Sequence, residues 1–212
     1  MAVTLSQYIT QCRRLLHDAN ANFWTDQELT DYINDARNKL VRDTGCLRRL
    51  QSSTTVVNQE TYDFADLPEG SRTMDIININ LYWGNSRIPL RYLAWTDFNA
   101  QLRYWQNYTG RPIAYSMYGP QKFYLGPVPD EVYTIELDTV VEPEVLVNNA
   151  DVDTIPDIWT SPVAFYASYT AKFKEQSYGE AEIFNQQYMK KVQSVLVGSF
   201  TRRMPTPYSQ AY

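Results

Sequence analysis

The side chains that most often carry catalysis or bind metals are few in this sequence. His17 is the single histidine, and no second histidine or glutamate stands at the spacing of a metal site. Cys12 and Cys46 are too few for a disulfide framework or a thiolate zinc site, so we expect both to be reduced and packed. The sequence contains no phosphate-binding, nucleophile-elbow or dinucleotide-binding glycine pattern. It predicts no enzyme activity, no metal and no cofactor.

A cluster of acidic residues is the candidate for metal-dependent chemistry. Asp151, Asp153 and Asp157 follow two glutamates, and converging carboxylates can bind a hard cation. A metal-dependent hydrolase is therefore one interpretation of the function, and it ranks third, after the two that are given below. The segment lacks the glycine turn and terminal glutamate of a calcium loop. We interpret residues 141–156 as a polar, acidic connection exposed to solvent.

Three arginine pairs are the main basic features. The formal net charge is -5 and the pI is about 4.9. Proteins that bind nucleic acids usually carry the opposite, positive charge on their binding surface. We expect Arg13 with Arg14, and Arg48 with Arg49, at solvated helix ends. The third pair lies in residues 199–212, an extended, proline-containing tail that we expect to anchor the chain to a partner. Its candidate partner-binding residues are Arg202, Arg203, Met204, Pro205, Pro207, Tyr208 and Tyr212.

Tyrosine is unusually abundant. The chain has 17 tyrosines, against 8 phenylalanines and 5 tryptophans. Tyrosine combines a large apolar area with a polar tip, which suits surfaces that are soluble alone and later buried against a partner. Exposed aromatics could instead form a sugar platform. A carbohydrate- or receptor-binding module is therefore the alternative function.

Helical periodicity marks five segments that would position these residues. Thr25 and Glu28 have the spacing of a capping box before the second helix, which Gly45 should end. Ser161 should cap the fourth helix, and Gly179 should separate it from the fifth. Phe165, Tyr169 and Phe173 should mark the face of the fourth helix. The predicted helices cover about 4–19, 26–44, 96–108, 161–178 and 180–197.

Strand-like alternation occupies about 53–91 and 113–140. Residues 54–57 and 61–64 should form a hairpin, and Pro89 should lie on an edge strand because it cannot donate to a ladder. Apolar residues at alternate positions should face the core in two further strands. They are Ile77, Ile79, Leu81 and Trp83 in one strand and Tyr133, Ile135 and Leu137 in a second meander over 113–140.

The order of elements predicts an α+β fold. A bundle of the N-terminal and C-terminal helix pairs should carry antiparallel β-meander insertions and an extended C-terminal tail. We predict one domain over residues 1–198 followed by a docking tail over 199–212. No apolar run approaches the roughly 20 residues of a membrane span, and Met1 is not followed by a basic and then apolar leader. We therefore expect no membrane association and synthesis in the cytosol.

The same segments resemble the head-to-tail adaptor proteins of tailed bacteriophages, also called head-completion, connector or tail tubular proteins. The resemblance covers most of the chain and includes the closing helix pair. The residues that carry it are Phe23 to Leu29, Tyr32 to Ala36, Gly110-Arg111-Pro112, Tyr115, Phe123 to Asp130 and Tyr133-Thr134-Ile135.

This resemblance implies a structural virion protein at the head-to-tail interface, assembled in the host cytoplasm. It implies a homo-oligomeric ring, twelvefold in this family, that binds the portal protein and a tail or nozzle protein. Duplex DNA would pass through the lumen without specific binding. Two motifs are interpreted as turns that set strand register. Their residues are Gly110, Arg111, Pro112, Gly126, Pro127, Pro129 and Asp130.

Overall fold

The computed structural model describes residues 3–105 and 107–200. The chain divides into two compact units. The helical unit contains the residues up to Leu47 and those from Pro143 onwards, and the β unit runs from Arg48 to Glu142. The predicted α+β class is confirmed. The division into one domain over 1–198 and a docking tail over 199–212 stays a prediction.

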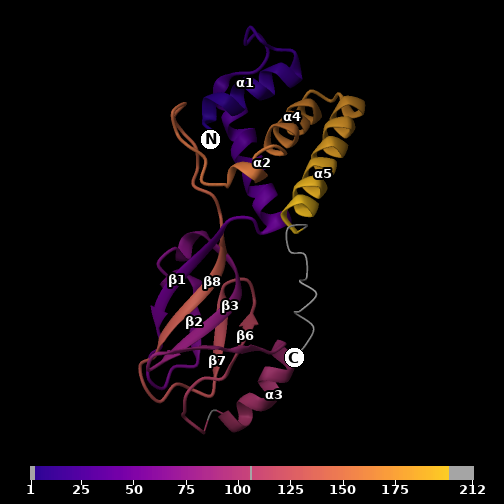
Figure 1. Ribbon diagram of the computed structural model, residues 1–212. Coiled ribbons are helices and arrows are strands. Elements are labelled where there is room, and N and C mark those ends of the chain that lie inside the picture. The colour runs from indigo at the N-terminus through magenta and orange to yellow at the C-terminus, as the bar shows by residue number, and fades with distance from the viewer. Residues whose placement is uncertain (1–2, 106, 201–212) are drawn as a thin grey trace, which may run out of the picture. The chain divides into compact units, whose positions relative to one another are not determined.

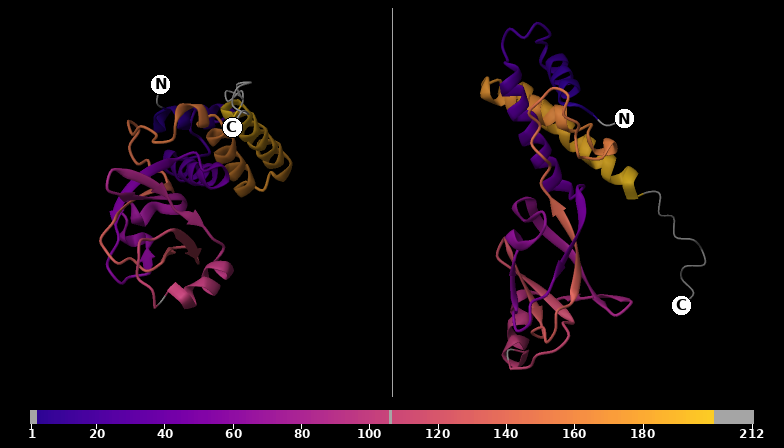
Figure 2. Two further views of the ribbon diagram at one scale, coloured as in Figure 1. Left: turned by 60° about the horizontal axis from the view of Figure 1, so that its bottom comes forward. Right: turned by 90° about the vertical axis from the view of Figure 1, so that its left-hand side faces the viewer.

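Four helices build the helical unit. Helix α4 packs against the other three and lies beside α5 in the views of Figures 1 and 2. The N-terminal and C-terminal helix pairs therefore form a bundle, as predicted. The helices are α1 (Leu5–Leu16), α2 (Asp26–Thr44), α4 (Val163–Lys174) and α5 (Tyr178–Phe200).

The predicted capping box begins α2. The Glu28 N–H donates to Thr25 Oγ1 over 3.2 Å, and the Glu28 carboxylate accepts from the Thr25 N–H over 3.2 Å, which satisfies two N–H groups at the helix start. Gly45 ends the helix with a φ of 59°, a left-handed conformation that glycine adopts without steric cost. The apolar face of α2 is fully buried at Leu29, Ile33, Ala36 and Leu40.

The predicted end of α1 and start of α4 are wrong. Helix α1 ends at Leu16 rather than near residue 19, because His17 adopts a left-handed φ of 56°. At the start of α4, Pro162 rather than Ser161 occupies the N-cap position, and no side chain caps the helix. Local sequence signals thus located these helices but not their ends.

The boundary between α4 and α5 also differs from the prediction. Gln176, with a φ of 63°, lies in the break between the helices, so Gly179 falls inside the first turn of α5. Helix α5 continues through Gly198 to Phe200. A glycine within a helix costs only about 1 kcal/mol relative to alanine, so it weakens the helix without ending it.

The buried face of α4 consists of small residues rather than the predicted aromatic face. Phe165 and Tyr169 are half-buried and Phe173 is exposed, whereas the side chains that face α1, α2 and α5 are short. Small side chains let the central helix approach its neighbours closely. They are Val163, Ala164, Ala167, Ser168 and Ala171.

The described part of the β unit, seen in Figure 1, contains eight strands, one α-helix and two short 3-10 helices. The sheets have the strand orders β1-β8-β3-β4 and β2-β7-β6-β5. Pro89 lies on the edge strand β4, as predicted. The elements are β1 (Arg48–Thr54), β2 (Thr61–Asp63), β3 (Thr73–Trp83), β4 (Ser86–Pro89), β5 (Arg91–Tyr92), α3 (Trp95–Trp105), β6 (Ala114–Tyr118), β7 (Lys122–Gly126) and β8 (Thr134–Val141).

The predicted strand pairings are wrong in two places. Strand β1 starts at Arg48 and pairs with β8, and β2 pairs with β7, so β1 and β2 form no hairpin. Strand β8 leaves the second meander and lies between β1 and β3. Each sheet therefore combines strands from both predicted regions. This exchange lets both sheets contribute to one core, which includes Tyr62, Phe64, Ile79, Leu81, Phe123, Leu125, Ile135 and Leu137.

A register shift changes the buried set of β3. The pairing with β8 slips between Ile76 and Asn78, and a slip of one residue moves side chains to the opposite face. Ile76 is therefore buried and Ile77 is exposed. Trp83, predicted to face the core, is 58% exposed at the strand's end. The predicted inward set of Tyr133, which precedes β8, and Ile135 and Leu137 within it is confirmed.

Candidate interaction surfaces

A buried ion pair fixes residues 143–156 in the helical unit. Arg37 on α2, with a side chain only 1% exposed, places Nη2 at 2.7 Å and Nε at 3.1 Å from Asp153 Oδ1. The Tyr8 hydroxyl donates to Asp153 Oδ2 over 2.6 Å. Burial, and then the charge of Asp153, raise the pKa of Tyr8, so the phenol keeps the proton that it donates. Asp153 is therefore no solvated linker residue, contrary to the prediction.

Hydrogen bonds to main-chain groups hold the rest of this connection. The Asn34 side chain donates to Leu146 O and accepts from the Leu146 N–H, each over 3.0 Å. Arg37 Nη1 donates to Glu144 O over 2.7 Å. The Leu5 N–H donates to Asp151 O over 3.1 Å. Residues 143–156 thus form an ordered part of the helical unit.

The three aspartates of the hydrolase interpretation have separate roles. Asp151 accepts from the N–H groups of Asn148 and Val147, which lower its pKa, and Asp157 begins a short 3-10 helix, Asp157–Trp159. Across residues 3–105 and 107–200, no three Asp, Glu, His or Cys side chains gather as metal ligands.

The remaining reactive side chains lie apart. His17 is exposed at the end of α1. Cys12 and Cys46 are free cysteines, one buried and one half-buried. Burial raises the pKa of Cys12 to about 12, so its thiol stays protonated and packs as a small apolar side chain.

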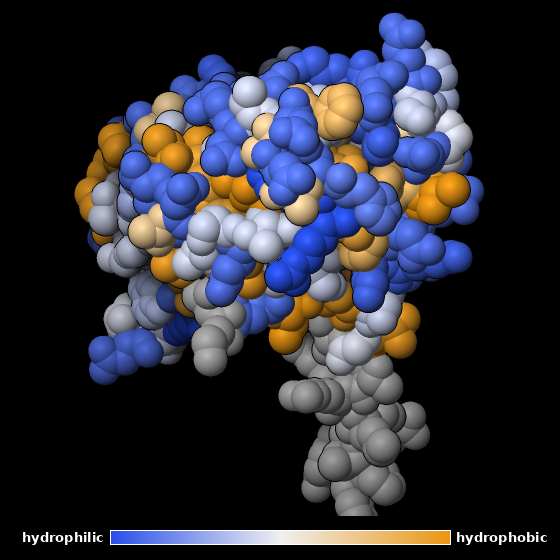
Figure 3. Space-filling model, turned by 90° about the horizontal axis from the view of Figure 1, so that it is seen from above, coloured by the Kyte–Doolittle hydropathy of each residue, from blue (hydrophilic) through white to orange (hydrophobic). Residues whose placement is uncertain are grey.

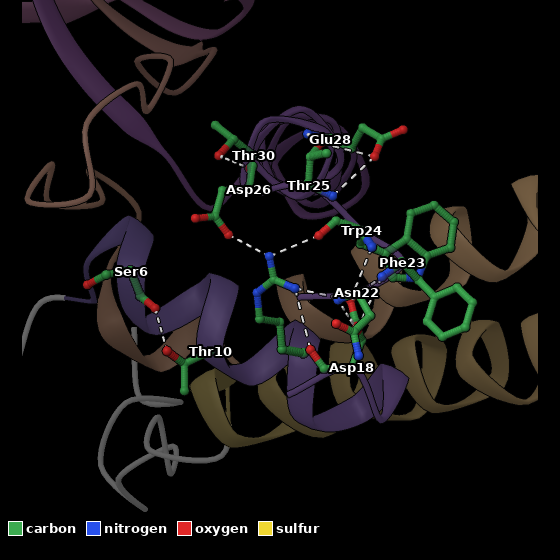
Figure 4. Close-up of polar contacts among 11 residues, drawn as sticks. Ser6, Thr10, Asp18, Asn22, Phe23, Trp24, Thr25, Asp26, Glu28 and Thr30 are labelled. Carbon is green, nitrogen blue, oxygen red and sulfur yellow. Dashed lines mark hydrogen bonds and ion pairs between the residues drawn. The ribbon is translucent and has the colours of Figure 1, made fainter. Parts of the chain in front are cut away.

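A network of hydrogen bonds and ion pairs holds the corner formed by the end of α1, the following loop and the start of α2 (Figure 4). Arg13 was predicted at a solvated helix end, but its side chain is 11% exposed and bonds to Asp18, Asp26 and the Trp24 carbonyl. The Asp18 carboxylate accepts from the backbone N–H groups of residues 22–24. The network holds a loop that leaves Phe23 83% exposed.

Acid should weaken this corner. Burial raises the pKa of Asp18, but the N–H groups and Arg13 outweigh it, so the pKa lies below its usual 3.8. The stability from the Asp18 carboxylate is therefore present above about pH 4 and is lost as the pH falls through the lowered pKa. We expect Asp18→Asn to be less stable than the natural chain at pH 6, with a difference that shrinks below pH 4. Denaturant titrations between pH 6 and pH 2.5 measure this difference, and a constant difference would contradict the assignment.

The β unit contains an aromatic groove with a volume of about 420 Å³. Trp83 is exposed at the end of β3, and Tyr108, which follows α3, is 65% exposed. The Arg111 guanidinium lies 4.5 Å from the centroid of the Trp83 ring, a cation–π distance. We define the aromatic groove by Trp83, Tyr108, Gly110, Arg111, Ile113, Pro127 and Tyr133.

The two predicted turn motifs meet at this groove. The Gly110 N–H donates to Val128 O over 2.8 Å, and the Ile113 N–H donates to Gly126 O over 2.9 Å. The two segments therefore run side by side. Pro112, Pro127 and Pro129 are buried, whereas Asp130 is exposed. Gly110, Arg111 and Pro127 line the groove, a location that local turn signals did not indicate.

Two carboxylates lie close to one lining residue of the groove, Tyr133. The Tyr133 hydroxyl donates to Asp130 Oδ1 over 2.8 Å. Burial, the bond to Asp130 and the charges of Asp130 and Glu131 raise the pKa of Tyr133 to about 12. Arg111 makes no ion pair with any carboxylate of the described residues. The groove thus combines aromatic faces, one guanidinium and two nearby carboxylates.

The predicted tail residues, Arg202, Arg203, Met204, Pro205, Pro207, Tyr208 and Tyr212, lie outside the described residues.

On the face shown in Figure 3, apolar side chains form separate groups among hydrophilic ones. The described helices are each too short or too polar to cross a bilayer.

The described residues thus form a helical unit with a buried ion pair and a β unit with an aromatic groove. Residues 3–209 match the model of the SU10 adaptor protein family, and the chain belongs to this family. No curated protein shows a significant match to the chain. Membership makes the protein a structural adaptor of bacteriophage and implies a virion component that contacts the portal and the tail.

Proposed function

We propose that copies of this chain form a ring under the portal and join the DNA-filled head to the tail. The family match over residues 3–209 carries this proposal. In a ring, which we take to be dodecameric, each subunit presents two different faces to its neighbours, and closure prevents filaments. Assembly takes place in the host cytoplasm, and the ring remains at the head-to-tail interface of the virion.

Duplex DNA passes through the lumen of the proposed ring without specific binding. The formal net charge of -5 supports this role, because clustered basic contacts would bind the phosphates and retain the DNA. The ordered connection over residues 143–156 also supports an adaptor, since a surface fixed before assembly loses little conformational entropy on binding.

The tail segment should be required for assembly. We expect the full chain to sediment as a monomer alone and as a ring with portal. Deletion of residues 199–212 should leave a folded monomer that assembles on the portal at least about tenfold more weakly, because removing interface anchors, whether to the portal or to a neighbouring subunit, typically costs about 2 kcal/mol or more. Sedimentation and circular dichroism measure both properties, and a Gly-Ser segment of equal length is the control.

Two outcomes would contradict the proposal. Truncated protein that caps DNA-filled heads normally would show that the tail has no docking role. A lone trimer that binds glycans and ignores the portal would instead favour the carbohydrate- or receptor-binding alternative.

A further inference from the structure

The aromatic groove has the chemistry of a site for an extended, proline-containing peptide. Such peptides bind between aromatic side chains, because the flat rings pack against proline and the stiff peptide loses little entropy. Trp83 and Tyr108 offer exposed rings, while Ile113 and Pro127 add apolar walls. Tyr133 is held in place by Asp130 and is only 8% exposed.

The chain itself contains a segment with matching chemistry. Residues 202–208 read Arg-Arg-Met-Pro-Thr-Pro-Tyr. Prolines two positions apart restrict φ and favour extended backbone at the residues before them. Two arginines precede the prolines, and residues 199–212 contain no acidic side chain. The segment thus combines a stiff apolar centre with a basic end.

Charge complementarity supports this match. Asp130 and Glu131 are both exposed beside Tyr133, so two carboxylates lie within reach of a basic segment that binds the groove. The Arg111 guanidinium is held over the Trp83 ring. Arginine pairs strongly with carboxylates, which would set the direction of the bound peptide, with its basic end at Asp130.

We propose that the aromatic groove binds residues 202–208 of a neighbouring copy. Pro205 and Pro207 pack against Trp83 and Tyr108, and Arg202 and Arg203 pair with Asp130 and Glu131. This inference rests on the proposed function, because it requires copies that lie side by side. It assigns the tail to the neighbouring subunit rather than to the portal.

Photo-crosslinking in the full chain tests this contact. A benzoylphenylalanine replaces Tyr208, chains labelled with ¹⁴N and ¹⁵N are mixed and assembled on portal, and crosslinked peptides are identified by mass spectrometry. We expect crosslinks between differently labelled chains, at residues 83, 108–113 or 127–133. Trp83→Ala should lower their yield at least tenfold, as should Pro205→Ala combined with Pro207→Ala.

The matched control is Tyr104→Ala, which removes an aromatic side chain that is 80% exposed on α3 outside the groove. Its crosslink yield should equal that of the natural chain. Crosslinks within single chains, to the portal, or elsewhere on the subunit would overturn the inference, as would a yield unchanged by Trp83→Ala. Sedimentation of the same samples tests ring assembly separately. A ring without groove crosslinks leaves the proposed function intact, whereas absence of a ring contradicts that function.

Discussion

Asp153→Ala is expected to lower the free energy of unfolding by about 3–5 kcal/mol, because it leaves the buried Arg37 guanidinium without its counter-charge. The Tyr8 hydroxyl and the Ile155 N–H lose their acceptor in the same step. The connection over residues 143–156 should then detach from α2. Urea titration followed by circular dichroism measures the loss, and proteolysis within this connection reports its release.

The exposed pair Lys39–Asp43 supplies the matched control. Its nitrogen and oxygen are 2.7 Å apart with side chains 43% and 28% exposed, and exposed pairs contribute about 0–1 kcal/mol. Lys39→Met should therefore be nearly neutral. Arg37→Met combined with Asp153→Leu should be more stable than either single variant, since apolar replacement of both partners removes the uncompensated charge. Equal losses in Asp153→Ala and Lys39→Met would contradict the role of the buried pair.

Gly126→Ala is expected to destabilise the β unit by about 1–3 kcal/mol through overpacking. A Cβ atom at this position would lie 2.3 Å from Trp105 Cε3 and 3.1 Å from Phe98 Cε2. Real Cβ atoms do not approach so closely, so the Trp105 ring must shift and α3 must move from β7. Denaturant titration measures the loss, and tryptophan fluorescence reports the ring movement.

Gly110→Ala is the control for this substitution. A Cβ atom there would lie 3.5 Å from Tyr108 Cε1, an ordinary contact, so the change should stay within about 0.5 kcal/mol. Trp105→Leu should reduce the cost of adding Gly126→Ala by about 0.5–3 kcal/mol, because the two sites are in contact. Strictly additive effects would show that the ring does not oppose the added methyl group.

Sequence analysis predicted the helices and strands better than it predicted which strands pair with one another. Helical periodicity and the Thr25–Glu28 capping box depend on neighbours a few residues apart, so the N-terminal helices were located well. Strand pairing joins distant residues, as where Arg48 pairs with Val140. Nothing local favours this pairing over a hairpin between adjacent strands. The register shift after Ile76 is likewise set by contact with β8.

The buried ion pair left one readable signal in the sequence. Arg37 stands four residues after Ile33, on the apolar face of α2, and an arginine on such a face requires a buried acceptor. The acceptor, Asp153, lies 116 residues further along the chain. Local composition instead suggested a solvated acidic linker. Spacing alone therefore indicated that a partner was needed but could not identify it.

The aromatic groove was less accessible to sequence analysis. The Gly110-Arg111-Pro112 and Gly126 to Asp130 motifs have the composition of turns, and each was interpreted by itself. The bond from the Gly110 N–H to Val128 O brings them together. Trp83 joins them because the β3 register places it at an exposed strand end. The groove forms only because the two motifs and the end of β3 come together. The types of residue in the groove do not determine any of these three placements.

The pairing of β1 with β8 brings the two ends of the β unit close together, as in an inserted module. The chain enters this unit at Arg48 and leaves it after Glu142, and Arg48 pairs with Val140. Paired residues of antiparallel strands lie only about 5 Å apart, so the two junctions are close neighbours. A unit inserted through adjacent ends can be exchanged, lengthened or circularly permuted with little strain on its host. Such modularity would let one helical scaffold carry β units of different length or sequence.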